Sequence, residues 1–476
     1  MVEEHDLRVE EEELSERCRG QAASLDISVI WAETLVALAL NIRYASSGDV
    51  AIAYRILGSG PIDVVFVHGF VSNLEVQSEN PRDGEFFERL TSVGRVIRFD
   101  RRGTGLSDRV REVPTLETRM DDLRAVMDAA ESRRAVVVAT FDAAAMAMVY
   151  AATYPERVAG LAIYQPLAKG LRSHDYPWAP SEEETAAWIE QIRRNWGETE
   201  FAASDLRQYA PSVADDPQMQ EWWARVMRLG ASPGAALVIA RMAMAIDVRD
   251  VLPSIRVPTL VLYRDAGRGE ASYVAERIPN ARSVEIRGQD TIFWAAEGFA
   301  DEIVAFARSV WGEVEPDTVL ATILFTDIVR STEKAVELGD RAWADLVKRH
   351  HAVVRGELGR FHGRELDTAG DGFFAAFDGP IRAIRCAMAI EESVRSIGLD
   401  VRAGLHTGEC ETIGEKLGGI AVTIGARVAA KANAGEVLVS STVKDLVAGS
   451  DLSFQDRGRH ELKGIPGEWQ LFAVER

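Results

Sequence analysis

The sequence predicts two consecutive domains, a parallel α/β sheet with a helical lid and then a second domain with antiparallel strands. Short apolar runs that read as buried strands alternate with helical stretches over about 41–312, which is typical of a parallel sheet. Between about 167 and 246 this alternation gives way to helical, tryptophan-rich sequence, which favours a lid over the sheet. Within 317–476, a Gly-Asp-Gly turn separates two alternating strands and predicts a hairpin.

Composition limits the function classes. The chain has 476 residues, enough for two or three domains with their own cores. A formal net charge of -20 argues against a nucleic-acid partner, because phosphate binding needs a basic surface. Three scattered cysteines favour a reducing compartment, which places the protein in the cytoplasm. The apolar stretch 22–40 is interrupted by Asp26 and Glu33, so we expect no membrane span.

In chain order, residues 1–40 predict an acidic N-terminal extension that contains a helix. The first domain follows over 41–312, and its clearest strands are expected at 64–67, 96–99, 135–139 and 259–263. The lid tryptophans are expected to form the core of the lid. A short acidic stretch with a proline at 312–317 marks the expected boundary with the second domain.

Two aspartates of the second domain predict a metal site. Asp327 ends the apolar run ATILFTDIV and precedes a helix start at Ser331, where free backbone N–H groups favour negative charge. Asp371 lies in the hairpin turn between strands expected at 365–369 and 373–377. Either residue alone would read as an ordinary cap or turn residue. As a pair, the carboxylates suit Mg²⁺, which completes its coordination with substrate phosphates.

Five segments of residues 317–476 resemble the class III nucleotide cyclase catalytic domain, and they lie at 321–332, 364–377, 401–409, 418–430 and 461–467. The resemblance implies an α+β, ferredoxin-like domain that converts ATP to 3′,5′-cyclic AMP and pyrophosphate. It implies a nucleoside triphosphate as substrate and two Mg²⁺ or Mn²⁺ ions held by Asp327 and Asp371. It also implies a homodimer whose two active sites are each shared between the chains.

The resemblance also assigns phosphate-handling groups. Backbone N–H groups that would receive phosphate oxygens belong to Ile328, Val329, Arg330 and Ser331. Arg427 matches the arginine that stabilises the transition state, a task suited to a planar guanidinium. Lys463 matches the lysine that contacts the triphosphate.

Three positions depart from the family pattern. Thr423 stands where relatives carry an asparagine that positions the ribose, and its shorter side chain predicts slower turnover. Asp367 and Lys416 occupy the two base-reading positions with their charges interchanged, which weakens the standard adenine pose. ATP remains the favoured substrate. A cyclase that uses GTP and a nucleotide-binding pseudo-cyclase remain the alternatives.

The first domain resembles the α/β-hydrolase fold in the segments VVFVHGF at 64–70 and RVIRFDRRGTGLSDR at 95–109. The expected nucleophile turn aligns with 140–144 and places Asp142 where serine is usual. Thr291 stands where relatives carry the histidine base, and His68 belongs to the oxyanion-loop motif. Without a base, the expected outcome is an inactive hydrolase-like domain.

The order of the two domains is similar to that of actinobacterial two-domain cyclases. The intact fold motifs beside the broken catalytic set favour a pocket under the lid that binds a small apolar ligand and acts on the attached cyclase. A scaffold that orients or dimerises the cyclase is the alternative. An ester hydrolase with a vestigial cyclase is the least favoured reading, because of Thr291.

Overall fold

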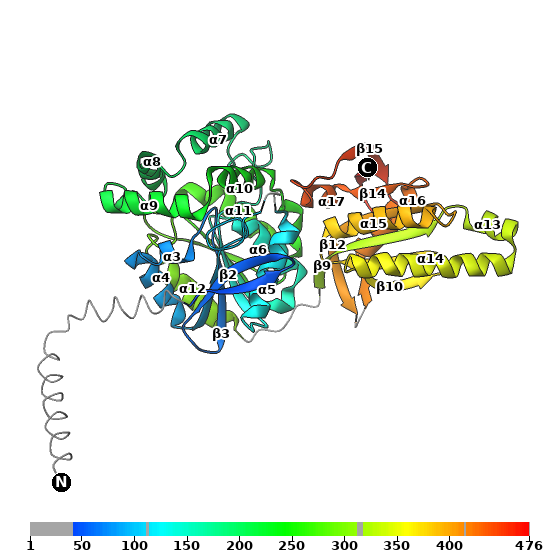
Figure 1. The fold of residues 1–476 in the computed structure, drawn as a ribbon, viewed down its shortest axis with the longest axis horizontal. Coiled ribbons are helices and arrows are strands. Elements are labelled where there is room, and N and C mark those ends of the chain that lie inside the picture. The colour runs from blue at the N-terminus through cyan, green and yellow to red at the C-terminus, as the bar shows by residue number, and fades with distance from the viewer. Residues whose placement is uncertain (1–40, 111–113, 312–317, 414–415, 476) are drawn as a thin grey trace, which may run out of the picture. The chain divides into compact units, whose positions relative to one another are not determined.

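Two eight-stranded sheets organise the chain, as the computed structural model shows (Figure 1). The structure describes residues 41–110, 114–311, 318–413 and 416–475. The expected N-terminal helix and the expected domain boundary at 312–317 lie outside these residues. Both sheets belong to one unit, Tyr44–Arg476.

The first sheet has the strand order β1-β2-β4-β3-β5-β6-β7-β8. Neighbours from β4 to β8 are parallel, whereas β2 is antiparallel to β4, so the predicted parallel sheet is confirmed with an antiparallel edge. The strands are β1 (Arg43–Ser47), β2 (Val50–Leu57), β3 (Ile62–Val67), β4 (Gly94–Phe99), β5 (Ala135–Thr140), β6 (Val158–Tyr164), β7 (Thr259–Tyr263) and β8 (Ala281–Glu285).

Helices cover both faces of this sheet because its central strands are apolar on both sides. On β3, Val65 and Val67 pack in one buried cluster, and Val64 and Phe66 pack in another on the opposite face. The first cluster includes α5 and α6, and the second includes α4 and α12. These and the other sheet-side helices are α3 (Leu74–Gln77), α4 (Pro81–Thr91), α5 (Leu116–Ala129), α6 (Ala143–Thr153), α11 (Arg268–Arg277) and α12 (Phe299–Val310).

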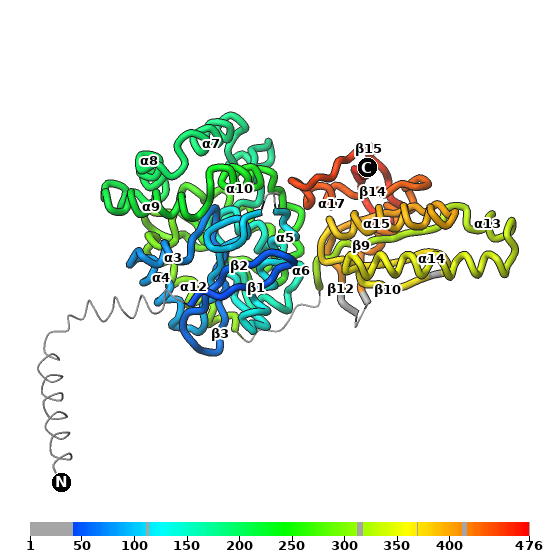
Figure 2. The backbone as a smooth tube through the Cα atoms, in the orientation of Figure 1, coloured from blue at the N-terminus to red at the C-terminus, as the bar shows by residue number. Residues whose placement is uncertain are grey.

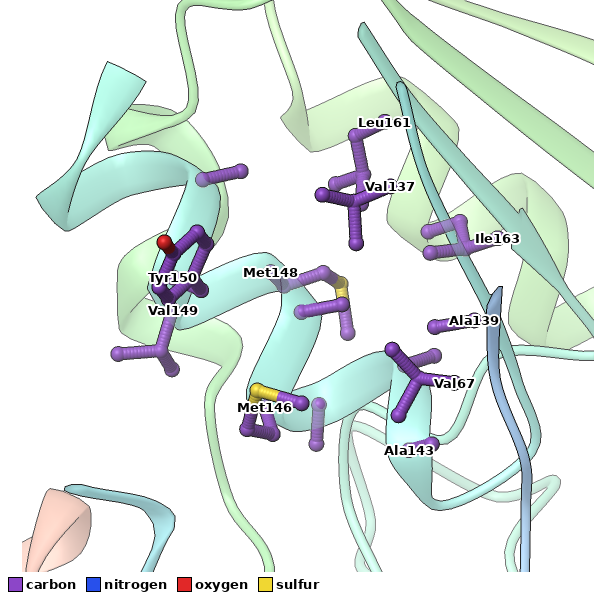
Figure 3. Close-up of a cluster of buried hydrophobic side chains, with 14 of the residues drawn as sticks. Val67, Val137, Ala139, Ala143, Met146, Met148, Val149, Tyr150, Leu161 and Ile163 are labelled. Atoms are coloured by element: carbon purple, nitrogen blue, oxygen red, sulfur yellow. The ribbon is translucent and has the colours of Figure 1, made fainter. Parts of the chain in front are cut away.

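Helix α6 is the most deeply buried of these helices. All of its residues are buried, and its alanines let it approach the strands closely (Figure 3). Ala143 and Met148 lie beside Val137 and Ala139 of β5 in this view. The helix that follows the expected nucleophile turn is therefore held rigidly in the core.

The predicted lid is helical and consists of α7 (Glu182–Asn195), α8 (Thr199–Tyr209), α9 (Pro217–Gly230) and α10 (Pro233–Ala245). Ser181 begins α7 with a capping box, and prolines begin α9 and α10 where no intrahelical N–H is needed. Trp196 and Trp222 are buried, as expected for lid core, whereas Trp178 is 45% exposed.

The second sheet is mixed and has the order β10-β11-β9-β12-β14-β16-β15, with β13 paired to β12. Its tube trace follows the yellow-to-red part of the chain (Figure 2). The strands are β9 (Thr318–Ile328), β10 (Arg364–Ala369), β11 (Gly372–Phe377), β12 (Val401–Ile413), β13 (Lys416–Gly418), β14 (Val437–Ser440), β15 (Phe454–Glu461) and β16 (Glu468–Val474). The helices are α13 (Ser331–Leu338), α14 (Asp340–Arg360), α15 (Pro380–Arg395), α16 (Ile420–Lys431) and α17 (Ser441–Leu446).

Helices lie on both faces of this second sheet as well. Apolar residues of α14 and α15 pack with Leu324 and Phe373 in one cluster. Helix α16 lies against β12, where Gly404 permits the approach, since a Cβ there would be 2.0 Å from the Ala429 nitrogen. The α+β fold expected of this region is confirmed.

Candidate active site

The strand register brings Asp327 and Asp371 to the same end of the second sheet. Thr326 of β9 pairs with Phe373 of β11, so the residues that follow Thr326 lie beside those that precede Phe373. Asp327 is the next residue on β9, and Asp371 immediately precedes β11. Both side chains are half-buried.

The two carboxylates have different partners. Oδ2 of Asp371 is buried and has no hydrogen-bond partner among the described residues. Oδ2 of Asp327 lies 2.6 Å from Nη2 of Arg402, which is paired with Asp327 across β9 and β12. The sequence reasoning missed Arg402. Its signal was a lone charged residue in the otherwise apolar strand start Val401–Leu405.

The residues present fit a divalent metal ion. A buried carboxylate oxygen without a partner is costly unless a cation neutralises it. Hard cations such as Mg²⁺ prefer carboxylate oxygens and take several remaining ligands from phosphates and water. No cluster of three or more His, Cys, Asp or Glu side chains suited to a metal occurs in the described parts of the chain, so these two carboxylates would need such additional ligands.

The expected phosphate-binding turn precedes α13. Ser331 begins this helix, and Arg330 before it has a left-handed backbone with φ 56°. The N–H of Val329 donates to the carbonyl of Asp400 at 2.8 Å. The N–H of Val329 is therefore already used within the protein, and the phosphate contacts expected of Ile328, Arg330 and Ser331 stay a prediction.

Arg427 and Lys463 lie together. Nε of Arg427, on α16, donates to the carbonyl of Lys463 at 3.1 Å, and Lys463 is exposed in the loop between β15 and β16. Thr423 is exposed one helical turn before Arg427, and its hydroxyl is 3.5 Å from the carbonyl of Gly419. Within the described residues, no hydrogen bond or ion pair joins this group to Asp327 or Asp371.

The two base-reading candidates lie on separate strands. Asp367 is exposed on β10, and its carboxylate accepts the N–H of Thr368 at 2.9 Å. Lys416 begins β13, and its side chain lies outside the described part of the structure. The assignment of Asp367 and Lys416 to the base-reading positions therefore stays a prediction.

In the first domain, the strained residue of the strand-to-helix turn is Phe141. Its backbone is left-handed, with φ 50°, between the end of β5 and the start of α6. Asp142 has an ordinary right-handed helical backbone. A nucleophile in this fold sits on the strained turn itself, so the alignment that placed Asp142 there is one residue out of register. Phe141 has no nucleophilic atom.

The Asp142 carboxylate is already satisfied by the protein. Oδ1 accepts the N–H of Phe70 at 2.7 Å, and Oδ2 lies 2.7 Å from Nη1 of Arg101 and 3.5 Å from Nη2 of Arg119. Burial alone would raise the pKa of Asp142, but the two arginines and these hydrogen bonds outweigh burial and lower it. Asp142 is therefore a buried, ionised structural group.

The other two expected hydrolase residues do not complete a catalytic set. His68 packs edge-on against the ring of Phe66 at 4.9 Å, and burial, with the charges of nearby arginines, holds its pKa well below the usual value. The hydroxyl of Thr291 donates to the carbonyl of Tyr209 at 3.1 Å. No bond joins either residue to Asp142 in the described structure.

Family models match parts of both domains. Residues 315–476 match the family model of the adenylate and guanylate cyclase catalytic domain, and residues 63–268 match the serine aminopeptidase S33 model. No helix among the described residues has the length and apolarity needed to cross a membrane.

Two of the curated relatives show the extent of the similarity. An uncharacterized protein of Mycobacterium tuberculosis is 30% identical over 170 residues, which cover 33% of this chain and 56% of the relative. A receptor-type adenylate cyclase of Trypanosoma brucei is 27% identical over 204 residues, which cover 32% of this chain and 16% of the relative. The chain thus spans only part of the length of these relatives.

Two solved structures match the two domains separately. A bromoperoxidase from Bacillus anthracis is 20% identical with a TM-score of 0.49, and the match covers 57% of this chain and 100% of that protein. An adenylyl cyclase from P. aeruginosa is 20% identical with a TM-score of 0.32, and the match covers 34% and 97%. The family-model matches over 63–268 and 315–476 identify an α/β-hydrolase-like domain followed by a domain of the adenylate and guanylate cyclase catalytic family.

Proposed function

We propose that this chain is a nucleotide cyclase that converts ATP to 3′,5′-cyclic AMP and pyrophosphate. The observation that carries the proposal is the buried, unpartnered Oδ2 of Asp371 at the same strand ends as Asp327. In a cyclase-family domain, this arrangement supports a site for metal and triphosphate.

Asp327 and Asp371 would hold two Mg²⁺ or Mn²⁺ ions. When bound, such ions lower the pKa of the ribose 3′-hydroxyl and neutralise phosphate charge. Arg402 now balances the charge of Asp327 at 2.6 Å. A cation on Asp327 would release this guanidinium, which could then donate to a phosphate oxygen.

Arg427 and Lys463 would supply the remaining positive charge. The bond from Nε of Arg427 to the Lys463 carbonyl leaves the two terminal nitrogens of its guanidinium for the α-phosphate. Lys463 is exposed and would meet the triphosphate as a point charge. Thr423 would position the ribose with a shorter reach than an amide side chain, so we expect slow turnover.

A homodimer would complete the site. Within the described residues of one chain, no hydrogen bond or ion pair joins Asp327 and Asp371 to the group that contains Arg427. This supports a site shared between two chains. A half-buried apolar surface also supports a partner. The rings of Phe325 and Phe374 stack at 4.7 Å there, on the sheet face opposite to Leu324 and Phe373.

The hydrolase-like domain is proposed to regulate the cyclase rather than to hydrolyse a substrate. Helix α5 carries Arg119, which pairs with Asp142. On the same helix, Glu117 pairs with Arg382 in the first turn of α15 at 2.9 Å and accepts the N–H of Ile381 at 3.0 Å. A movement of α5 would therefore shift the start of α15, which follows β11, through the contacts of Glu117. A small apolar ligand under the lid would be one cause of such a movement.

The proposal is tested by incubating the purified chain with Mn²⁺ and either ATP or GTP and measuring cyclic nucleotide and pyrophosphate. We expect product from ATP, less from GTP, and none from Asp371→Ala. Product formed only from GTP would show that GTP, not ATP, is the substrate. Nucleotide binding without product would indicate a pseudo-cyclase. In a second arm, inactive Asp327→Ala and Arg427→Ala proteins are mixed. Recovered activity supports the shared site, and its complete absence would count against it.

A further inference from the structure

The turn that carries Asp371 has little stiffness of its own. Asp371 lies between Gly370 and Gly372, and Gly370 has a left-handed backbone with φ 64°. Glycine loses more conformational freedom on ordering than any other residue. A metal-binding carboxylate needs a fixed position, so this turn requires an anchor from elsewhere in the fold.

Helix α14 supplies an anchor through His351. Nε2 of His351 lies 3.0 Å from the carbonyl oxygen of Gly370. A carbonyl only accepts hydrogen bonds, so Nε2 carries the proton and donates. The imidazole ring also packs edge-on against the ring of Phe373, with centroids 5.1 Å apart. His351 therefore contacts the chain on both sides of Asp371.

Neighbouring residues of α14 do not share this role. His350 is fully buried, its two ring nitrogens have no partner among the described residues, and burial lowers its pKa to about 4, so it serves as neutral core. Arg355, one turn after His351, makes two 2.8 Å bonds to the carboxylate of Glu365. That contact holds β10 near its start, and the same guanidinium lies over the ring of Phe373, 5.6 Å from its centroid, without a bond to Gly370.

We propose that His351 is a positioning residue for the metal site, which acts by fixing the Gly370 carbonyl and so the direction of the Asp371 carboxylate. The proposal rests on the cyclase function proposed above and adds a residue to it. Groups that orient metal ligands without touching the metal commonly change metal affinity by 10–100-fold. His351 has the geometry of such a group.

Three variants separate this role from a general effect on the hairpin. His351→Phe keeps an aromatic ring against Phe373 but removes the N–H donor. His351→Gln restores a donor at a similar distance along the side chain. Arg355→Gln is the matched control, because it removes another polar contact between α14 and the hairpin but leaves the bond to Gly370 in place.

Two measurements are made on the full chain. Mn²⁺ binding is followed by the loss of the free-ion paramagnetic resonance signal, with 3′-deoxy-ATP present because it lacks the attacking hydroxyl. Hydrogen exchange reports the order of the backbone around residues 370–373. We expect His351→Phe to weaken Mn²⁺ binding about tenfold and to speed exchange at this turn. His351→Gln should stay within about threefold of wild type, and Arg355→Gln should speed exchange mainly near Glu365 and leave Mn²⁺ binding within the same threefold range.

Unchanged Mn²⁺ binding and exchange in His351→Phe would overturn the proposal, as would an equal loss of binding in Arg355→Gln. Wild-type protein that binds no Mn²⁺ would instead refute the metal site itself. In that case the hydrogen-exchange data alone decide whether His351 holds the turn. The metal-site proposal and the His351 proposal can therefore be refuted separately.

Discussion

Asp142 and Asp371 each lie at a functional turn of their domain, yet their surroundings are opposite. Asp142 is held by the N–H of Phe70 and by the guanidinium groups of Arg101 and Arg119. Asp371 keeps a buried carboxylate oxygen that no described group satisfies. The first carboxylate is satisfied by groups of the protein, and the second has an oxygen that no described group satisfies.

The comparison shows that a buried aspartate carboxylate can serve the fold when the protein supplies its partners, or a binding site when it does not. A buried carboxylate with charged partners contributes to folding and resists removal, because its partners would be left unpaired. A buried carboxylate without partners lowers stability and is retained where an outside ligand completes it. In these terms the Asp142 carboxylate has the contacts of a structural group, whereas the Asp371 carboxylate has an oxygen left for a ligand.

The largest expected effect is on folding. Asp142→Ala should lower the free energy of unfolding by about 3–5 kcal/mol, because it leaves two buried arginines without their carboxylate. Asp371→Ala should change the same quantity by less than about 1 kcal/mol, since it removes no protein contact of Oδ2. Denaturant titration followed by tryptophan fluorescence and by circular dichroism measures both variants.

A matched control for this pair is Asp142→Asn, which keeps the volume and an acceptor for Phe70 but loses the charge. It should fall between wild type and Asp142→Ala. Equal stability losses for Asp142→Ala and Asp371→Ala would remove the distinction between the two sites.

A smaller effect is expected from metal binding. Mn²⁺ at about a hundred times its dissociation constant, added in the presence of saturating 3′-deoxy-ATP, should stabilise the cyclase domain by about a further 2.7 kcal/mol. For a domain of this size, that corresponds to a rise in melting temperature of about 5–10 °C. Asp371→Ala should lose the metal-dependent part of the rise in a thermal-shift assay. A full shift in this variant would place the metal elsewhere.

Much of the fold could be predicted because its signals are local. Apolar runs such as that of β7 and the Gly-Asp-Gly turn between β10 and β11 fix strands and a hairpin without reference to the rest of the chain. Arg427 and Lys463, chosen from a family resemblance, lie in contact in the structure.

The missed features depend on pairing between distant segments. Arg402 meets Asp327 only through the register of β9 and β12, and His351 meets Gly370 only through the packing of α14 on the hairpin. The position of the strained residue was missed for another reason. The turn could be aligned in two registers, and only the backbone angle of Phe141 distinguishes them.

The smallest expected effect is on ester hydrolysis, where wild type and Asp142→Ala should both stay at the background rate with short-chain and long-chain acyl esters. The strained turn presents Phe141, which has no nucleophile. The N–H of Phe70, in the segment of the oxyanion-loop motif, already donates to Asp142. Thr291 donates its hydroxyl to Tyr209 and offers no base near neutral pH. Ester turnover by the wild type that is lost in Asp142→Ala would show that the Asp142 carboxylate leaves its arginine partners and reacts. The contrast between a structural Asp142 and a ligand-binding Asp371 would then be wrong.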